Sequence, residues 1–186
     1  MPTISAPSTV PGIYPDARFV RSPFHDERPE ASDISLIVIH GISLPPEQFG
    51  GLFVEQLFMG TLNADVHPYF AQIAHVKVSS HFYIKRCGEL LQFVNCEHRA
   101  WHAGVSSFEG RERCNDYSIG IELEGSDTQH YDARQYPVLT RLTQWLLAQY
   151  PNTGSNRIVG HEDIAPGRKT DPGPYFDWGR FRQSLG

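Results

Sequence analysis

The order of apolar and polar residues predicts three strands at the centre of a sheet. Positions 34–40, I-S-L-I-V-I-H, are a run of branched apolar residues that ends on a histidine and is typical of a buried central strand. Positions 118–125, S-I-G-I-E-L-E-G, alternate between polar or small and apolar residues with the period of two that a strand requires. Positions 157–161, R-I-V-G-H, predict a shorter strand that also ends on a histidine.

The segments around these strands predict helices and a hairpin. Two apolar-rich runs around a Cys-Gly turn predict an antiparallel hairpin over 80–94. The strongest helical periodicity lies at 137–150, where Pro137 suits the first turn. Its apolar face comprises Val138, Leu142, Trp145 and Leu146. Other helices are predicted near 52–58 and 67–75 and, with Asp177 as N-cap, over 177–185.

Strands interleaved with helices, together with one antiparallel hairpin, predict an α/β fold. We expect a single domain with a central mixed β-sheet flanked by helices. We place this domain at 31–186, because the chain has the length of one domain and shows no repeat or internal boundary. Residues 1–30 are rich in proline and charge and predict an irregular N-terminal arm along the surface.

Composition narrows the possible partners and the compartment. The formal net charge of -5 disfavours nucleic acid and anionic membranes, because both attract basic surfaces. No apolar run has the length of a membrane-spanning helix, and the first residues lack the basic and apolar regions of a secretory signal. The three cysteines form no C-x-x-C pair, which favours reduced thiols. We therefore expect a cytoplasmic protein with no obligate protein partner, no nucleic acid and no membrane.

Two histidines and an aspartate have the chemistry of a zinc site. His40 and His161 each follow a short apolar strand, and strand ends are where α/β sheets present functional groups. Asp171 lies in the segment 159–174, V-G-H-E-D-I-A-P-G-R-K-T-D-P-G-P, whose prolines exclude a helix and stiffen the chain. Two imidazoles and one carboxylate bind Zn²⁺ and leave the fourth tetrahedral position for water. The alternatives are hydrogen-bonded structural histidines and an aspartate that only forms a turn.

Other charged groups have positions that suit hydrolysis of an amide. Lys169 precedes Asp171 by two residues, so its ammonium can stabilise the oxyanion that forms when a carbonyl is attacked. A glutamate near the metal can act as general base. Alternation places both Glu122 and Glu124 on the polar face of their strand, and this pattern does not choose between them. The alternative is a solvated strand face that carries both carboxylates.

Trp101 and Arg113 are weaker candidates for substrate binding. Trp101, in A-W-H-A-G, can stack on a sugar, and Arg113, in G-R-E-R-C-N-D-Y, can bind a carboxylate with two hydrogen bonds. Each has an ordinary alternative, as a packing aromatic or a solvated arginine. The remaining histidines are too many for one site and are interpreted as mostly structural: His25, His67, His75, His81, His98, His102 and His130.

From about residue 20 to about residue 183, the chain resembles the zinc N-acetylmuramoyl-L-alanine amidases. This family includes cytoplasmic enzymes of bacterial cell-wall recycling, phage lysins and peptidoglycan recognition proteins. The matching motifs are I-V-I-H-G-I-S-L-P-P-E-Q-F-G-G, V-S-S-H-F-Y-I, R-A-W-H-A-G-V-S, G-R-E-R-C-N-D-Y-S-I-G-I-E-L-E-G and G-H-E-D-I-A-P-G-R-K-T-D-P-G-P. The resemblance is closest to the recycling enzymes, and it implies a mixed sheet flanked by helices with zinc in a groove on one face.

The resemblance also implies a role for each main candidate. His40, His161 and Asp171 match the zinc ligands. Glu122, rather than its neighbour on the same strand face, matches the catalytic glutamate, and Lys169 matches the lysine beside the metal. The implied substrate is an anhydromuropeptide. The implied reaction is hydrolysis of the amide between the lactyl group of 1,6-anhydro-N-acetylmuramic acid and L-alanine.

Three positions bear on substrate affinity rather than on the reaction. Arg113 matches an arginine that contacts the substrate. Lys77 lies where the family has arginine, which leaves a point charge in place of a bidentate fork. Gly41 follows His40 where the family has asparagine, so a hydrogen bond beside the metal is missing or replaced. The alternative functions are an amidase that acts on intact peptidoglycan and a non-catalytic muropeptide-binding module, although such modules lack the complete ligand set.

Overall fold

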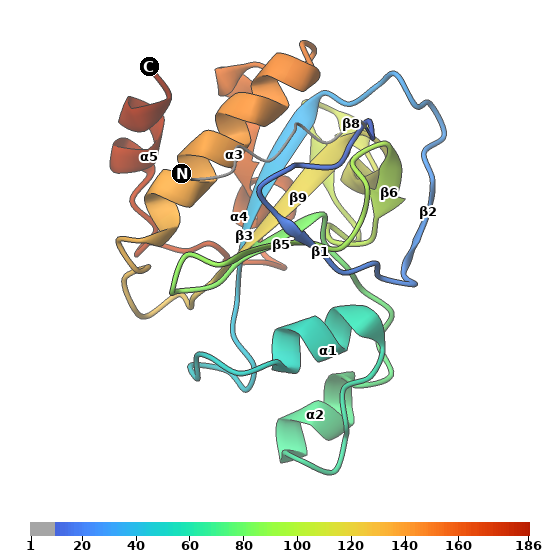
Figure 1. Ribbon diagram of the computed structural model, residues 1–186, viewed down its shortest axis with the longest axis vertical. Helices are drawn as coiled ribbons and strands as arrows, with labels where there is room; N and C mark the ends of the chain where they lie inside the picture. Colours follow the sequence, from blue (N-terminus) through green and yellow to red (C-terminus); the bar gives the residue numbers. More distant parts are fainter. Residues whose placement is uncertain (1–9) are drawn as a thin grey trace, which may run out of the picture.

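A six-stranded mixed sheet forms the centre of the molecule (Figure 1). The computed structural model describes residues 10–186, and the strands of this sheet are ordered β1-β5-β4-β9-β3-β10. They span Arg18–Phe19 (β1), Leu36–Ile42 (β3), Phe82–Ile84 (β4), Leu90–Gln92 (β5), Ser118–Glu124 (β9) and Ile158–Gly160 (β10). β4 and β5 are antiparallel, whereas β4, β9, β3 and β10 run parallel, so the carboxyl ends of these four strands meet at one edge.

Two small sheets and the helices complete the fold. The small sheets pair β2 (His25–Glu27) with β6 (His98–Ala100) and β7 (Ser107–Phe108) with β8 (Arg111–Glu112). The α-helices are α1 (Phe53–Met59), α2 (Pro68–Ile73), α3 (Gln135–Gln149), α4 (His161–Ile164) and α5 (Trp178–Leu185), with 3-10 helices at Cys114–Asp116 and Ser155–Arg157. None of the helices in the described chain is long and apolar enough to cross a membrane.

Helices α3 and α5 cover one face of the sheet. Figure 1 shows them together on the side away from α1 and α2. The apolar residues of β3 and β9 that alternate toward this face are buried with residues of both helices: Ile37, Ile39, Ile119, Ile121, Leu123, Leu139, Leu142, Leu146 and Phe181. Each such side chain contributes about 1.5–3 kcal/mol when it is buried. This layer therefore fixes the positions of β3 and β9, and with them the side chains on the opposite face of both strands.

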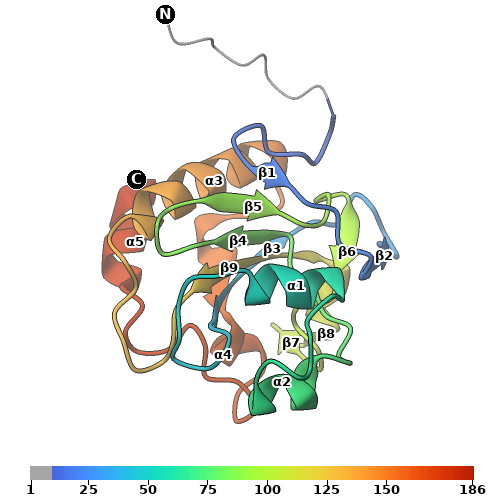
Figure 2. The ribbon, with the colours of Figure 1, turned by 60° about the horizontal axis from the view of Figure 1, so that its bottom comes forward.

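The opposite face of the sheet is apolar at both ends and polar in the middle. Next to β4 and β5, α1 and α2 form one buried cluster, to which Phe58 belongs (Figure 2). Next to β3 and β10, Val38 and Ile164 belong to another. Between the two clusters, His40 of β3 and Glu122 of β9 are direct neighbours in the strand register. The polar middle of this face is therefore the place for a candidate site.

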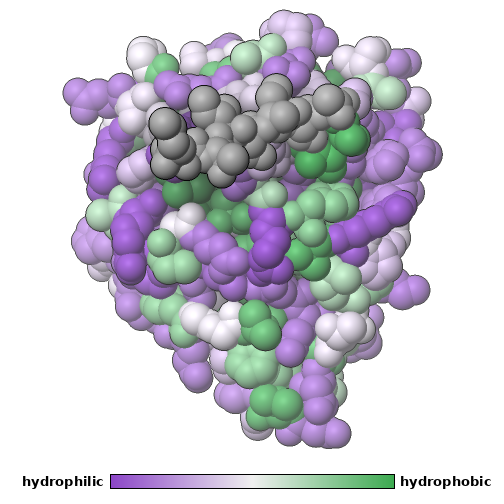
Figure 3. All heavy atoms as spheres, viewed as in Figure 1, coloured by the Kyte–Doolittle hydropathy of each residue, from purple (hydrophilic) through white to green (hydrophobic). Residues whose placement is uncertain are grey.

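One face of the molecule is largely polar. Hydrophilic residues cover most of the face seen in Figure 3, and apolar residues are dispersed among them. The large apolar residues that are exposed also come from separate parts of the chain: Val10, Phe19, Leu52, Val66, Val76, Val105 and Tyr175.

The predicted mixed α/β fold is confirmed, as are most of its elements. β3, β9 and β10 occupy the three predicted strand segments, β4 and β5 form the predicted hairpin, and α1, α2 and α5 lie where helices were expected. Asp177 caps α5, because its side chain accepts a hydrogen bond of 2.9 Å from the backbone N–H of Arg180. Helix α3 begins at Gln135, earlier than predicted, so Pro137 lies within its first turn.

Two expectations from the sequence need correction. The segment 159–174 does contain a helix, α4, because its four residues end before Pro166 and the prolines restrict only the chain that follows. The N-terminal arm is only partly irregular in its described part, because β1 and β2 each pair with another strand. Arg28 in this arm is buried rather than spread on the surface. Residues 1–9 of the arm lie outside the described residues.

Candidate metal centre

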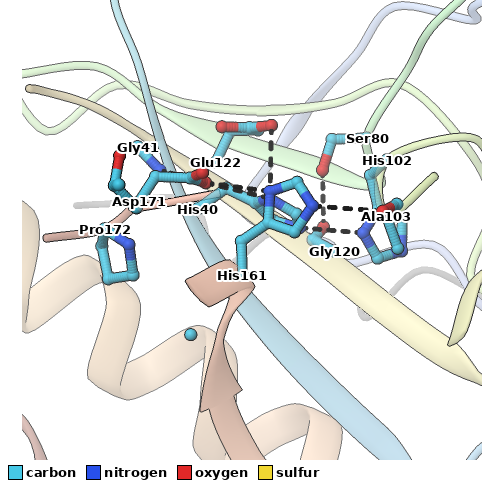
Figure 4. Close-up of polar contacts among 12 residues, drawn as sticks. His40, Gly41, Ser80, His102, Ala103, Gly120, Glu122, His161, Asp171 and Pro172 are labelled. Atoms are coloured by element: carbon cyan, nitrogen blue, oxygen red, sulfur yellow. Dashed lines mark hydrogen bonds and ion pairs between the residues drawn. The ribbon is translucent and has the colours of Figure 1, made fainter. Parts of the chain in front are cut away.

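Two histidines and one aspartate converge at the carboxyl ends of the parallel strands (Figure 4). His40 belongs to β3, and His161 is the first residue of α4, directly after β10, the neighbour of β3. Asp171 comes from the proline-rich loop that follows α4. Nδ1 of His40 lies 3.0 Å from Nδ1 of His161 and 3.3 Å from Oδ2 of Asp171. Nδ1 of His161 lies 3.1 Å from the same carboxylate oxygen.

The spacing and the chemistry of these three atoms fit a zinc ion. Zinc binds imidazole nitrogen and carboxylate oxygen at about 2.0–2.2 Å with tetrahedral geometry, which separates neighbouring ligand atoms by about 3.3–3.5 Å. The observed separations of 3.0, 3.1 and 3.3 Å are close to these values. Three groups of the kinds that bind zinc therefore already have nearly the arrangement that the ion requires.

The outward nitrogens of both rings have partners that leave Nδ1 available for a metal. Nε2 of His161 lies 3.2 Å from the carbonyl oxygen of Ala103, which only accepts, so Nε2 carries the proton. Nε2 of His40 lies 2.8 Å from Nδ1 of His102, and Nε2 of His102 lies 3.1 Å from the hydroxyl of Ser118. With Nδ1 of His40 turned to the metal position, its Nε2 donates to His102. Such outer partners orient a metal-binding imidazole and raise its basicity.

His102 is a candidate that the sequence reasoning missed. The interpretation of this histidine as structural had no reason to connect it with His40, which is 62 positions away. The sequence holds one weak signal, the small residue Gly120 on the polar face of β9. A Cβ atom there would lie 2.5 Å from the His102 ring, so the glycine leaves space for the imidazole. The signal does not tell which ring fills the space.

The two glutamates of β9 are both buried but have different surroundings. The carboxylate of Glu124 accepts hydrogen bonds from the backbone N–H groups of Gly50 and Arg86. In contrast, Oε1 of Glu122 lies 3.9 Å from Nδ1 of His40, and its Oε2 has no hydrogen-bond partner among the described residues. The alternative of a solvated face with two carboxylates is therefore wrong. Glu122 is the one whose carboxylate remains available beside the metal position.

The surroundings shift the pKa values of these groups in different directions. Burial and the charge of Asp171 raise the pKa of Glu122 well above its ordinary value, and Lys169 partly opposes them. For Asp171, burial alone would raise the pKa, but the contacts with His161 and His40 outweigh it and hold the pKa well below the usual range. Burial lowers the pKa of His40 to about 4. Neutral imidazole and ionised carboxylate are the forms that bind a metal.

The three atoms lie in a groove of about 710 Å³. The segment after β3, helices α1 and α2, and the loops 125–128 and 168–171 supply its lining. Lys169 lines the groove two residues before Asp171, and its charge acts on the pKa of Glu122. An ammonium group, a carboxylate with one unpaired oxygen among the described residues, and a metal position therefore share one cavity.

Of the candidates for substrate binding, Trp101 lines the groove and Lys77 does not. Trp101 lines the groove, its indole nitrogen donates to Asp26 at 3.0 Å, and its ring stacks on Phe24 with the centroids 6.2 Å apart. These contacts fix the indole as a rigid wall. Lys77 is exposed and lies outside the set of lining residues, although the residues on either side of it belong to that set.

Arg113 lies outside the groove. Its side chain is 71% exposed and pairs with Asp116 at 3.2 Å. It lines a neighbouring hollow of about 580 Å³, and Arg168 lines both cavities. Arg113 therefore does not reach the metal position.

A mixed sheet, a groove and a His-His-Asp cluster are the features to compare with known proteins. The chain belongs to the N-acetylmuramoyl-L-alanine amidase family, whose model matches residues 30–174. The matched range contains the three converging side chains and Glu122.

Individual relatives agree with this assignment. The chain is 56% identical, over 94% of its length and 92% of the relative, to the 1,6-anhydro-N-acetylmuramyl-L-alanine amidase AmpD of Enterobacter cloacae. A crystal structure of a selenomethionine AmpD derivative matches with a TM-score of 0.92 and 54% identity, over 95% of this chain and 98% of that one. The Escherichia coli amidase AmiD, solved with the substrate anhydro-N-acetylmuramic acid-L-Ala-D-γ-Glu-L-Lys, matches with a TM-score of 0.61 and 30% identity, over 82% of this chain and 57% of that one.

Proposed function

We propose that this protein is a zinc-dependent amidase that hydrolyses the bond between the lactyl group of 1,6-anhydro-N-acetylmuramic acid and L-alanine in peptidoglycan recycling. The convergence of two Nδ1 atoms and one carboxylate oxygen in a groove, beside the unpartnered carboxylate of Glu122, carries this proposal. Membership of the amidase family supports the reaction class. The names of the AmpD relatives and the substrate in the AmiD complex support the anhydro sugar and the bond.

His40, His161 and Asp171 are proposed to hold the metal, with His102 orienting His40 through its Nδ1. Zinc would supply Lewis acidity toward the substrate carbonyl and toward the attacking water. Glu122 has the position and the raised pKa of a general base, because its free Oε2 can take the proton from that water.

After the attack, the same carboxyl group can return the proton to the nitrogen of L-alanine as the amide bond breaks. The ammonium group of Lys169 stabilises negative charge on the carbonyl oxygen as that charge develops. The protein thus needs one proton carrier and one fixed positive group, and both lie in the groove.

We infer that the substrate extends from the groove toward the neighbouring hollow, because Arg168 lines both cavities. We infer that Trp101 stacks against the sugar, because its indole is a rigid part of the groove lining. Arg113 and Lys77 are proposed to meet carboxylates of the stem peptide. Arg113 is placed for the far end, next to Arg168, and Lys77 for a weaker contact at the rim.

We also propose that the enzyme acts in the cytoplasm and that its catalytic groups lie within residues 31–186, while β1 of the preceding arm completes the central sheet. The cysteines of the chain, Cys87, Cys96 and Cys114, are unpaired, which suits a reducing compartment. The proposal requires an anhydromuropeptide substrate and no protein, nucleic-acid or membrane partner.

The test is mass spectrometry of the products after purified protein is incubated with anhydro-N-acetylmuramyl tripeptide. We expect free tripeptide, its loss in the presence of a zinc chelator, and its return when zinc is added back. Intact substrate after incubation with folded, zinc-loaded protein would contradict the proposal. A parallel incubation with polymeric peptidoglycan separates the alternatives, because preferred cleavage of the polymer would indicate an amidase of the intact wall.

A further inference from the structure

A tyrosine from another part of the chain holds the segment that carries Asp171. Tyr131 lies between β9 and α3, and its side chain is buried. Its hydroxyl donates a hydrogen bond of 2.9 Å to the carbonyl oxygen of Pro172, the residue directly after Asp171. The ring also packs edge-to-face against Phe176, with the centroids 5.4 Å apart. Tyr131 therefore contacts the loop on the carboxyl side of the candidate ligand at two places.

Two glycines make room for this tyrosine. A Cβ atom at Gly41 would lie 2.1 Å from the hydroxyl oxygen of Tyr131, and one at Gly125 would lie 2.2 Å from its Cε1. Real Cβ atoms do not approach other atoms so closely, so any other residue at either position would displace the ring. Gly41 directly follows His40 in β3. The ring is thus wedged between the strand that carries one candidate ligand and the loop that carries another.

The other close contacts of this loop involve backbone atoms or exposed groups. The N–H of Glu162 donates to the carbonyl of Asp171 at 2.9 Å, and the N–H of Gly41 lies 3.4 Å from Oδ2 of Asp171. Thr170, on the other side of Asp171, donates its hydroxyl to the carboxylate of Asp127, and this contact is exposed. The Tyr131 hydroxyl is therefore the buried side-chain contact through which a substitution can move the loop.

We propose that Tyr131 is a positioning residue that sets the distance between the Asp171 carboxylate and the two imidazoles. This inference rests on the proposed zinc-dependent function, because displaced carboxylate oxygen would lose its place in the metal's coordination. Groups that act on a metal through a ligand typically change metal affinity about 10–100-fold.

The substitution Tyr131→Phe tests this role, because it removes the hydroxyl and keeps the ring. We expect the Kd for zinc, measured by competition with a chromophoric chelator, to rise about 10-fold. Amidase activity that is lost at limiting zinc should return when zinc is in excess, since the hydroxyl does not touch the substrate. Wild-type zinc affinity in this variant would overturn the inference.

Tyr136→Phe is the matched control. Tyr136 is as buried as Tyr131 and also packs against Phe176, and its hydroxyl accepts a hydrogen bond of 2.8 Å from the N–H of Asp177, at the start of α5. Both variants should lower the melting temperature of the metal-free protein, but Tyr136→Phe should leave the Kd for zinc unchanged. An equal loss of zinc affinity in the control would show a general effect of stability and would overturn the positioning role.

A double-mutant cycle with Gly41→Ala provides a second measurement. In the wild-type background, the new Cβ would push on the hydroxyl oxygen, and we expect about a 10-fold or larger rise in the Kd for zinc. In the Tyr131→Phe background that oxygen is gone, so the further rise should be below about 3-fold. Additive effects would contradict the inference. If the wild-type protein binds no zinc, the proposed function itself fails; if it binds zinc and Tyr131→Phe binds it equally well, only the inference fails.

Discussion

Two buried polar clusters lie beside β9. The first contains Arg28 and His81, which hydrogen-bond to backbone groups of β9. The second contains His40, His161 and Asp171, and His40 pairs with Glu122 of β9 in the strand register. In the first cluster, the side chains pair mainly with backbone groups, and Nη2 of Arg28 also lies 3.1 Å from Nε2 of His81. Arg28 donates to the carbonyl oxygens of four residues: Cys96 at 3.1 Å, Asn115 at 3.2 Å, Asp116 at 3.1 Å and Ser118 at 2.8 Å. Nδ1 of His81 accepts from the N–H of Gly120, and its Nε2 donates to the carbonyl of His98, both at 3.0 Å.

The second cluster is different, because its inner atoms are three acceptors that point at one another. The rings of His40 and His161 use their protons outward, and Oδ2 of Asp171 lies 3.3 and 3.1 Å from their inner nitrogens. The lone pairs that remain face a common position within the groove. Buried polar residues that satisfy one another hold the fold, whereas buried polar residues with lone pairs left over mark a place for something else.

His102 connects the two clusters. Its Nδ1 contacts His40, and its ring lies edge-on to that of His81, with the centroids 5.8 Å apart. It is itself fully hydrogen-bonded, as the members of the first cluster are, yet it acts on a member of the second. The comparison between the clusters therefore predicts that a substitution of His102 lowers zinc affinity, but less than the loss of a ligand does.

The largest expected effect concerns the carboxylate without a partner. Glu122→Gln keeps the size of the side chain but cannot take a proton, so the rate of hydrolysis should fall by about 10²–10⁴-fold. Zinc content, measured by atomic emission, should stay at the wild-type level. Glu124→Gln is the matched control, because that carboxylate serves the backbone of Gly50 and Arg86. Its substitution should lower the melting temperature and leave kcat of the folded protein nearly unchanged; wild-type rates in Glu122→Gln would remove the assigned role.

The second prediction compares zinc affinity and stability when one residue of each cluster is replaced. Asp171→Ala should weaken zinc binding by more than about 100-fold, beyond the loss of an outer contact, and should change the stability of the metal-free protein by only about 1 kcal/mol. Arg28→Met should do the reverse. It removes the guanidinium donor from four carbonyl groups, whose contacts at Cys96 and Ser118 are buried, so the free energy of unfolding should fall by about 3–5 kcal/mol.

Chemical denaturation of metal-free protein and chelator competition measure these two quantities. The folded fraction of Arg28→Met should bind zinc with nearly wild-type affinity. The comparison between the clusters breaks down if Asp171→Ala retains its zinc or if Arg28→Met loses zinc affinity more than stability.

The smallest effect concerns His102. His102→Leu removes the acceptor for Nε2 of His40 and should weaken zinc binding about 10–100-fold. His102→Asn, whose amide oxygen can accept the same hydrogen bond, should recover part of that affinity, whereas His81→Leu should cost stability alone. Isothermal titration with zinc measures the three variants. Equal zinc affinities for the leucine variants of His102 and His81 would place His102 in the structural cluster.

The sequence allowed the candidate ligands to be predicted because their signals are local. His40 and His161 each follow a short apolar run, and these two matching positions, together with Asp171 nearby among prolines, suggested one set of ligands. The mixed sheet, the hairpin and the long helix followed from periodicity for the same reason. Helix α4 escaped prediction because it is a single turn, shorter than any periodic pattern can reveal.

The remaining features depend on contacts between distant segments. Glu122 and Glu124 are equivalent in the strand pattern, and only the loops at Gly50 and Arg86 make one of them structural. Arg28 lies in a proline-rich arm that suggested a surface position, but its partners belong to residues 96–118. His102 and Tyr131 act through other residues, so their own neighbours in the sequence carry no sign of their roles.

X-ray absorption at the zinc edge of the purified protein tests the central claim most directly. We expect one zinc ion per chain with two imidazole nitrogens and carboxylate oxygen in its first shell, at distances of about 2.0–2.2 Å. The His161→Ala variant should lose one imidazole contribution from the spectrum of whatever zinc it retains. Sulfur in the first shell at about 2.3 Å, or a wild-type spectrum with no imidazole, would contradict the assignment of the converging atoms to a metal.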